Sequence, residues 1–241
     1  MKHGSESSKD QAVGQLIEIA LNTADNDADQ ARLFRSAVVA GGGLPALMGV
    51  LRSEEPQRQF MGARALHALA IDDPSTDADN FHSEEICQHG AIPLLVKALA
   101  SEEEQVQVAA TGALSQLAEN PICQQMIVGE GAIAPLVNIA SYANDMHKLG
   151  AMNALDVLEI NNPTAREELE KAGAASMLEG IGTMGSSLLR EQAVTLGTRL
   201  QQPAQATPLS PESQVQEARK VRIRYDGVRR RAMSMMRGWE G

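Results

Sequence analysis

The chain has 241 residues, 43% of them hydrophobic and only 2% aromatic, so a sizeable core must be built from Ala, Leu, Ile, Val and Met. Ala and Leu favour helices, which points to an all-α fold. The net charge of −10 is uneven: from Glu212 onward eight basic and four acidic residues give +4, which leaves −14 on residues 1–211. This acidic body argues against a nucleic-acid partner.

The N-terminal segment, residues 1–10, is polar and rich in serine, and we expect it to be a disordered tail. It has no apolar core of a secretory signal and no Gly at position 2 for myristoylation. The chain also lacks a run of 18 apolar residues, so we expect no membrane span. These features favour a cytoplasmic location, with the nucleus as the alternative.

An acidic run, Asp25-Asn26-Asp27-Ala28-Asp29, is similar to the start of an EF-hand calcium loop. That loop needs Gly at its sixth position and Glu at its twelfth, where this chain has Gln30 and Ser36. We therefore expect an acidic loop between helices, without a metal.

A short phrase recurs along the chain at intervals of 48, 41 and 42 residues. Its copies are Gly42-Gly43-Leu44-Pro45-Ala46-Leu47, Gly90-Ala91-Ile92-Pro93-Leu94-Leu95-Val96, Gly131-Ala132-Ile133-Ala134-Pro135-Leu136-Val137 and, in decayed form, Gly173-Ala174-Ala175-Ser176-Met177-Leu178. The longer first interval contains residues 72–83, a polar stretch that we interpret as an inserted loop.

A second phrase follows the first at a fixed offset. Its copies are Ala65-Leu66-His67-Ala68-Leu69-Ala70, Ala113-Leu114-Ser115-Gln116-Leu117-Ala118 and Ala154-Leu155-Asp156-Val157-Leu158. The fourth copy is weak, because Gly197 replaces the leucine found at Leu155. Two phrases kept in register over several copies indicate a true structural repeat.

Each repeat has a readable physical logic. Its Gly tolerates positive φ and ends one helix, and the following Pro suits the first turn of the next. Ser101 and Glu104 have the spacing of a capping box before another helix. That helix carries one apolar face at a period of 3.6, made of Val106, Ala109, Ala110, Ala113, Leu114 and Leu117. No single repeat can cover its own face, so neighbours must stack.

Taken together, the two phrases resemble the second and third helices of the armadillo repeat family. The resemblance covers residues 12–200 and implies a right-handed α-solenoid of about four repeats, whose third helices line a concave groove for peptides or helices. Residues 15–20 resemble the last helix of an incomplete first repeat, and residues 31–40 the short first helix of the next.

By this resemblance, the partner-binding groove is lined by third-helix residues: Arg64, His67, Ala68, Thr111, Ser115, Gln116, Asn153 and Asp156. Importin- and catenin-type members place a groove Asn just before the final Leu of the third helix. Here those positions hold Ala68, Gln116 and Val157, and the body has no Trp. The pattern therefore argues against a nuclear-import receptor.

The C-terminal region divides into a Pro-rich linker, residues 201–212, and a basic amphipathic helix, residues 213–241, after a solenoid of residues 11–200. Its basic residues include Arg222, Arg224, Arg229, Arg230 and Arg231. Three roles compete: a cap on the last repeat, a basic arm that contacts anionic partners or the acidic body, and a calmodulin-type target helix. Ser234 follows Arg231 at a kinase-like spacing, but we expect it to be unmodified.

The sequence offers little catalytic or metal-binding chemistry. Cys87 and His89 fall short of the four ligands that zinc needs, and Cys123 belongs to the next repeat, so we expect structural cysteines in a reducing compartment. We find no phosphate loop, nucleophile elbow or kinase signature.

We therefore predict a non-catalytic scaffold or adaptor, without cofactor, whose groove holds a peptide or helix of a partner protein. The alternative is an autoregulated adaptor, or a fragment of a larger armadillo protein, whose basic tail occupies the acidic groove or binds an anionic partner.

Overall fold

The computed structural model describes residues 11, 13–15, 28–71, 81–202 and 209–237. The elements in these ranges are all α-helices, with no strand among them, which confirms the predicted all-α fold. The chain divides into two compact units, Met1–Glu130 (unit 1) and Gly131–Gly241 (unit 2), and each is described by itself.

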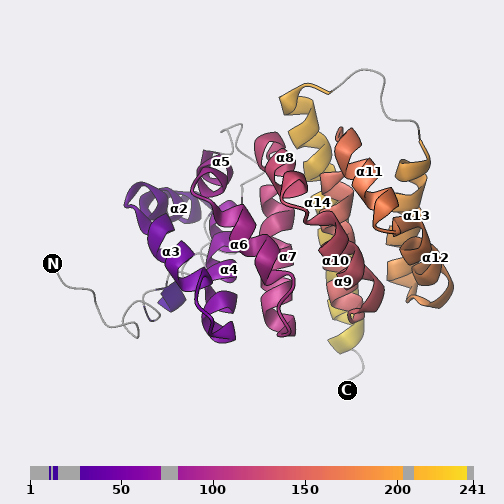
Figure 1. Ribbon diagram of the computed structural model, residues 1–241, viewed down its shortest axis with the longest axis horizontal. Helices are drawn as coiled ribbons and strands as arrows, with labels where there is room; N and C mark the ends of the chain where they lie inside the picture. The colour runs from indigo at the N-terminus through magenta and orange to yellow at the C-terminus, as the bar shows by residue number, and fades with distance from the viewer. Residues whose placement is uncertain (1–10, 12, 16–27, 72–80, 203–208, 238–241) are drawn as a thin grey trace. The chain divides into compact units, whose positions relative to one another are not determined.

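Unit 1 contains two successive sets of three helices and the first helix of a third set (Figure 1). These are α2 (Ala28–Ala40), α3 (Gly43–Leu51), α4 (Pro56–Ala70), α5 (Phe81–Gln88), α6 (Ala91–Ala98), α7 (Glu104–Leu117) and α8 (Pro121–Gly129). The third helices α4 and α7 form the most extensive contact of the unit, and each also packs on the second helix of its own set. Equivalent helices of successive repeats therefore stack, as the repeat spacing predicts.

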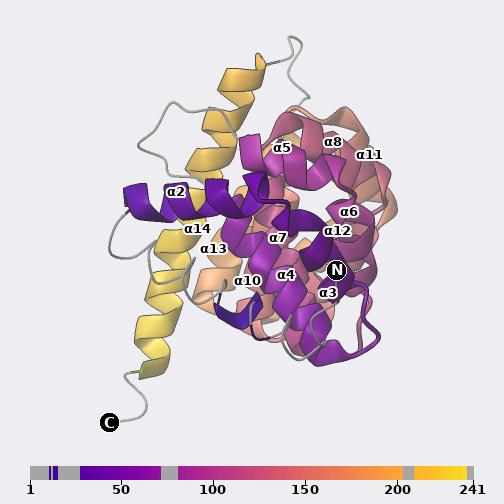
Figure 2. The same cartoon turned by 90° about the vertical axis from the view of Figure 1, so that its left-hand side faces the viewer.

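Unit 2 contains the rest of the third set, a complete fourth set and one long C-terminal helix. These are α9 (Ile133–Tyr142), α10 (Asp145–Leu158), α11 (Pro163–Lys171), α12 (Ala174–Met184), α13 (Ser187–Gln201) and α14 (Pro211–Arg237). The helix α10 packs on α9, α13 and α14. Figure 2 shows α14 on the side of α10 and α13 that faces away from α12.

Glycines set the boundary between the first and second helix of every repeat. Gly42, Gly90, Gly131 and Gly173 all have φ between 74° and 83°. An L-residue with a side chain is strained in this left-handed region, and glycine is not. The prediction that the Gly of each phrase ends a helix is therefore confirmed.

The core is made largely of small and aliphatic side chains, as the composition predicts. Ala63, Ala65, Ala110 and Ala113 are completely buried between helices. Two helices approach closely at Gly62, where an added Cβ would lie 2.8 Å from the backbone nitrogen of Leu51. Small residues thus let α4 press against the end of α3.

Two local predictions are wrong. Ser101 does not cap α7: the N-cap residue is Glu103, whose backbone N–H donates to the Ser101 hydroxyl at 3.2 Å. The inserted loop is also shorter than predicted, because α5 already begins at Phe81 and includes residues 82 and 83. His82 therefore lies in a helix, where its imidazole Nε2 is 3.0 Å from the Ser36 hydroxyl on α2.

Several predictions lie wholly or mainly outside the described residues. These concern the tail (1–10), the helix at 15–20, the acidic loop that starts at Asp25, the polar insertion before Phe81 and the middle of the linker, 203–208. In the part of the chain that is described, no single helix is long and apolar enough to cross a membrane.

Candidate partner-binding surfaces

Each of the two third helices of unit 1, α4 and α7, presents one row of partly exposed residues. In the last three turns of α4 almost everything is buried except Arg64 and His67, and Phe60 precedes them at the same spacing. On α7 the corresponding row is Val108, Gly112 and Ser115. We call these six residues the α4–α7 stripe.

The two rows of the stripe lie next to each other. A Cβ added at Gly112 would be 3.5 Å from the His67 ring, so the imidazole lies over the bare backbone of α7. The Arg64 guanidinium lies 5.5 Å from the centroid of the Phe60 ring, a cation–π distance. The stripe therefore combines a fixed cation, an aromatic ring and an exposed aliphatic side chain at Val108, which is 39% exposed.

The other predicted groove residues of unit 1 are buried. Ala68 is completely enclosed, and Thr111 and Gln116 are 4% and 7% exposed. The Gln116 side-chain amide donates to the carboxylate of Glu119, just after the end of α7, at 2.8 Å. Of the predicted set, it is Arg64, His67 and Ser115 that reach the surface in this unit.

In unit 2 the equivalent row on α10 is covered. Leu149, Asn153 and Asp156 correspond in register to Val108, Gly112 and Ser115, and they are 1%, 6% and 2% exposed. We call these three residues the α10 face. The helix α14 lies against α10, and it pairs with Asp156 through Arg224, at 3.7 Å. The same row therefore has opposite exposure in the two units.

A buried ion-pair cluster lies at this face. Arg199 of α13 contacts Asp156 at 2.8 Å and Glu159 at 2.9 Å, and Arg166 of α11 contacts Glu159 at 2.9 Å. The two carboxylate side chains are 3% and 1% exposed, so the arginines compensate charges that water cannot reach.

The four carboxylate oxygens of the cluster are divided among three arginines. Asp156 Oδ1 and Glu159 Oε1 face Arg199, and Glu159 Oε2 faces Arg166. The remaining oxygen, Asp156 Oδ2, faces Arg224 of α14. Burial raises the pKa of Asp156 above its ordinary value, while the guanidinium of Arg199 opposes this.

The helix α14 buries one face at a regular spacing. Gln214, Ala218, Val221, Val228 and Ala232 are all under 9% exposed, which is the four-three spacing of a helix packed along another helix. Arg231, seven residues after Arg224, lies 3.2 Å from Glu191 of α13. Of the other predicted tail residues, Arg229 and Arg230 are exposed and Arg222 is half-buried.

The entry into α14 is also fixed to unit 2. Asn161 follows α10 with a φ of 52°, and its side-chain oxygen accepts a hydrogen bond from the backbone N–H of Leu209 at 3.1 Å. Its amide also donates to the Gln214 side chain at 3.2 Å. Asn tolerates this left-handed conformation better than most residues, so one Asn lies in the turn after α10 and also contacts the start of α14.

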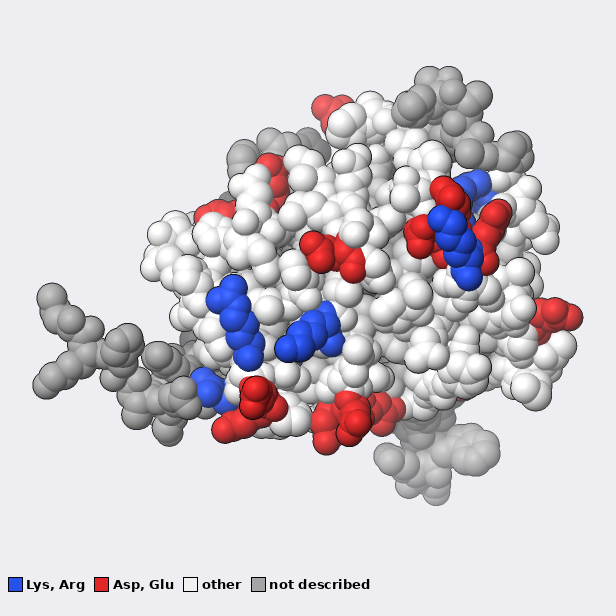
Figure 3. All heavy atoms as spheres, in the orientation of Figure 1, with Lys and Arg blue, Asp and Glu red and all other residues white. Residues whose placement is uncertain are grey.

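Charge is sparse on the side of each unit that carries the second helices. Figure 3 shows this side mostly without charged atoms, apart from isolated groups. On α11, Lys171 pairs with Glu167 and Glu168 at 2.9 and 3.0 Å, and all three side chains are well exposed. Exposed pairs of this kind contribute little to stability.

The comparisons with known proteins agree with this architecture. The model of the armadillo/beta-catenin-like repeat matches residues 82–119. A designed armadillo repeat protein in complex with the peptide (KR)4 is 22% identical, with a TM-score of 0.68 over 82% of this chain and 77% of that one. The armadillo repeats only protein of Plasmodium falciparum is 18% identical, with a TM-score of 0.67 over 79% of both chains. The chain has the armadillo-repeat fold. The curated proteins include no sequence match.

Within the armadillo register, sequence reasoning missed three members of the ion-pair cluster: Glu159, Arg166 and Arg199. One signal could have found Glu159, because it occupies the position that Ala70 and Ala118 hold in the preceding repeats. An acid in an alanine position of the core needs a cation nearby. The two arginines carry no such signal.

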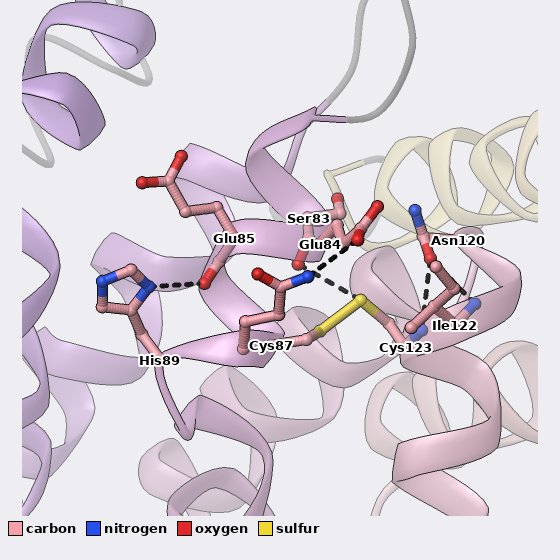
Figure 4. Close-up of a disulfide and its surroundings, with 9 residues drawn as sticks. Ser83, Glu84, Glu85, Cys87, His89, Asn120, Ile122 and Cys123 are labelled. Carbon is pink, nitrogen blue, oxygen red and sulfur yellow. Dashed lines mark hydrogen bonds between the residues drawn. A yellow bond between two sulfur atoms is a disulfide. The ribbon is translucent and has the colours of Figure 1, made fainter.

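The prediction that Cys87 and Cys123 are structural cysteines that do not pair with each other is wrong about the pairing. Cys87 of α5 and Cys123 of α8 form a disulfide between the first helices of consecutive armadillo repeats, with Cα atoms 5.9 Å apart (Figure 4). The two cysteines stand at different offsets from the Gly phrase, so the repeat register did not reveal their pairing. Cysteine usage therefore gives no support for a reducing compartment.

No group of three or more metal-ligating side chains is present in the described ranges. His89, which had been considered with Cys87, has its Nδ1 2.8 Å from the Glu85 carbonyl oxygen one turn back. Its ring therefore packs on its own helix, as Figure 4 shows.

Proposed function

We propose that the chain is a non-catalytic scaffold that binds a segment of a partner protein at the α4–α7 stripe. The observation that carries the proposal is the exposure of this row on two stacked third helices of an armadillo fold. A binding surface needs apolar contact and a few fixed polar groups, and the stripe supplies both.

The chemistry of the stripe favours a particular kind of segment. Because Gly112 adds no side chain, the His67 ring packs over the backbone of α7, and a partner side chain can contact this ring and the neighbouring Val108. Arg64, held over Phe60, is placed to pair with a carboxylate of the partner. We therefore expect a peptide or helix with an apolar residue close to an acidic one.

The test is quantitative affinity purification of the full chain carrying Ser115→Arg, which places a long cation in the stripe. A matched control is Gln125→Arg, an exposed position on α8. We expect at least one partner of the wild-type chain to be reduced tenfold or more by Ser115→Arg and retained by Gln125→Arg. Equal recovery of all partners with both variants would contradict the proposal.

A second function is favoured by the packing of α14 on α10. In that case the chain is an autoregulated adaptor, in which its own basic helix covers an acidic partner surface. The charge division between the −14 body and the +4 tail supports it, as does the Arg224–Asp156 pair.

A further inference from the structure

We infer that the α10 face is a receptor for basic amphipathic helices, and that a partner helix can replace α14 there. The inference rests on the autoregulated form of the proposed function and names the chemistry of the incoming segment. It commits to a protein helix with two cations seven residues apart, on the edge of a narrow face of small apolar residues.

The first argument is that the receptor does not depend on α14 for its own charge balance. Two arginines from α11 and α13 neutralise the two buried carboxylates and occupy three of their four oxygens. With α14 removed, Asp156 and Glu159 keep these partners and their positions. The surface is thus prepared for a ligand, which lowers the ordering cost of binding.

The second argument is that one oxygen is left for the ligand. Asp156 Oδ2 faces Arg224 at 3.7 Å, and Glu191 on α13 faces Arg231 at 3.2 Å. Both cations come from α14, and the side chains of Arg224 and Arg231 are 41% and 53% exposed. Such pairs are weak and screened by salt, so they select a basic helix without fixing it permanently.

The third argument concerns the apolar contact. The fully buried residues of this face of α14 are Ala218, Val221, Val228 and Ala232, with Gln214 at its start, and the half-buried Tyr225 lies between the two valines. Alanine and valine bury little area for each turn of helix. With so little apolar contact, the 27-residue helix α14 stays on α10 largely because the chain links the two covalently. This link gives α14 an effective concentration on the order of 1 mM at the α10 face.

These arguments set the partner's sequence pattern. A competing helix needs small or β-branched residues at the four-three spacing of α14 and Arg or Lys at the positions of Arg224 and Arg231. An acidic residue at the position of Arg224 would repel the Asp156 carboxylate, and an apolar one would leave its buried Oδ2 without a cation.

The experiment uses the full chain and a fluorescent synthetic peptide of residues 209–237 added in trans. The chain is prepared as wild type, as Arg224→Glu, and as Arg230→Glu, which reverses the same charge at an exposed position of α14. We expect the peptide to bind Arg224→Glu at least tenfold more tightly than the wild type, because the tethered helix is weakened. The Arg230→Glu chain should bind it like the wild type.

A second arm keeps the test decisive should a substitution disturb folding. The milder Arg224→Gln chain is compared by hydrogen exchange, and only the amides of α14 and of α10 should lose protection. A peptide carrying Arg224→Glu should bind the Arg224→Glu chain at least tenfold more weakly than the wild-type peptide. Three results would overturn the inference. The peptide could bind the three chains with equal affinity, or bind none of them at about 100 μM, which is near the weakest useful range. The two peptides could also bind the Arg224→Glu chain equally well.

The outcome is separable from that of the proposed scaffold. Loss of partners on Ser115→Arg reports on the α4–α7 stripe, and this variant leaves the sequence of α14 unchanged. Failure of peptide exchange with success of the Ser115 test would leave a scaffold with a permanently attached helix, and the converse result would leave the α10 face as the binding surface.

Discussion

The third helices α7 and α10 occupy the same place in successive armadillo repeats, yet the corresponding row of residues is partly exposed on α7 and buried on α10. On α7 the row of Val108, Gly112 and Ser115 stays partly exposed and carries no charge. On α10 the matching row of Leu149, Asn153 and Asp156 is buried, and it is charged. The repeat scaffold therefore fixes where a surface lies, while a few substitutions on it decide what covers that surface.

The largest expected effect comes from breaking the buried cluster of unit 2. Arg199→Ala leaves Asp156 and Glu159 buried with one cation fewer, and we expect the free energy of unfolding to fall by about 3–5 kcal/mol. Lys171→Ala, which removes an exposed pair on α11, should leave the free energy of unfolding nearly unchanged. Urea denaturation followed by circular dichroism measures both, and equal effects would contradict the role given to burial.

A smaller effect is expected from unit 1, where close helix packing replaces charge. Gly62→Ala places a Cβ 2.8 Å from the backbone of Leu51, so we expect a loss of about 1–3 kcal/mol in unfolding free energy. The matched control is Gly180→Ala on α12, which has open space around its Cβ and should gain up to about 1 kcal/mol. A stabilised Gly62→Ala protein would show that α3 and α4 are less tightly packed than described.

A smaller change in stability is expected from the titration of His82 in unit 1. Burial lowers the pKa of His82, and Arg35 adds to this effect while Glu85 opposes it. The unfolded chain therefore takes up the proton more readily than the folded one, so stability is full above about pH 6.5 and falls as the pH drops below it. His82→Gln should flatten this fall between pH 7 and 5, and His89→Gln, at an exposed position, should preserve it; thermal melts across that range decide the matter.

The smallest change in global stability is expected at the far end of α14. Arg231→Ala removes an exposed pair with Glu191, and the unfolding free energy should change by less than about 0.5 kcal/mol. Hydrogen exchange should nevertheless quicken in the last turns of α14 and stay unchanged in α7. Equal exchange rates in the last turns of α14 in the wild type and the variant would mean that Arg231 does not help to hold the helix.

The contrast between α7 and α10 also marks what the sequence could reveal. The helix boundaries were predictable because Gly90 or Gly131 acts locally, through its own φ and the helix that follows. Residues that act across long separations were not predictable. Nothing near Asp156 in the sequence indicates that Arg199 and Arg224, 43 and 68 positions away, complete its charge.

The same limit explains the partner surfaces. Arg64 and His67 were placed on the third helix correctly, since helical periodicity fixes their row. Whether that row is open depends on what else the chain packs over it. The contacts of α14 with Asn161 and with Glu191 of α13 cannot be read from the pattern of α14 itself. The amphipathic pattern of α14 predicts that it packs against another helix but does not reveal that this helix is α10.

The disulfide between Cys87 and Cys123 has a mechanical consequence. It closes a loop across a sequence separation of 36 that contains all of α6 and α7. If the two ends of the chain are pulled apart, force passes through the sulfur atoms and these two helices carry no load. The oxidised chain should therefore extend less than the reduced one, by on the order of 120 Å of contour length. The helix α7, which carries half of the α4–α7 stripe, would then stay folded longer than the helices outside the loop.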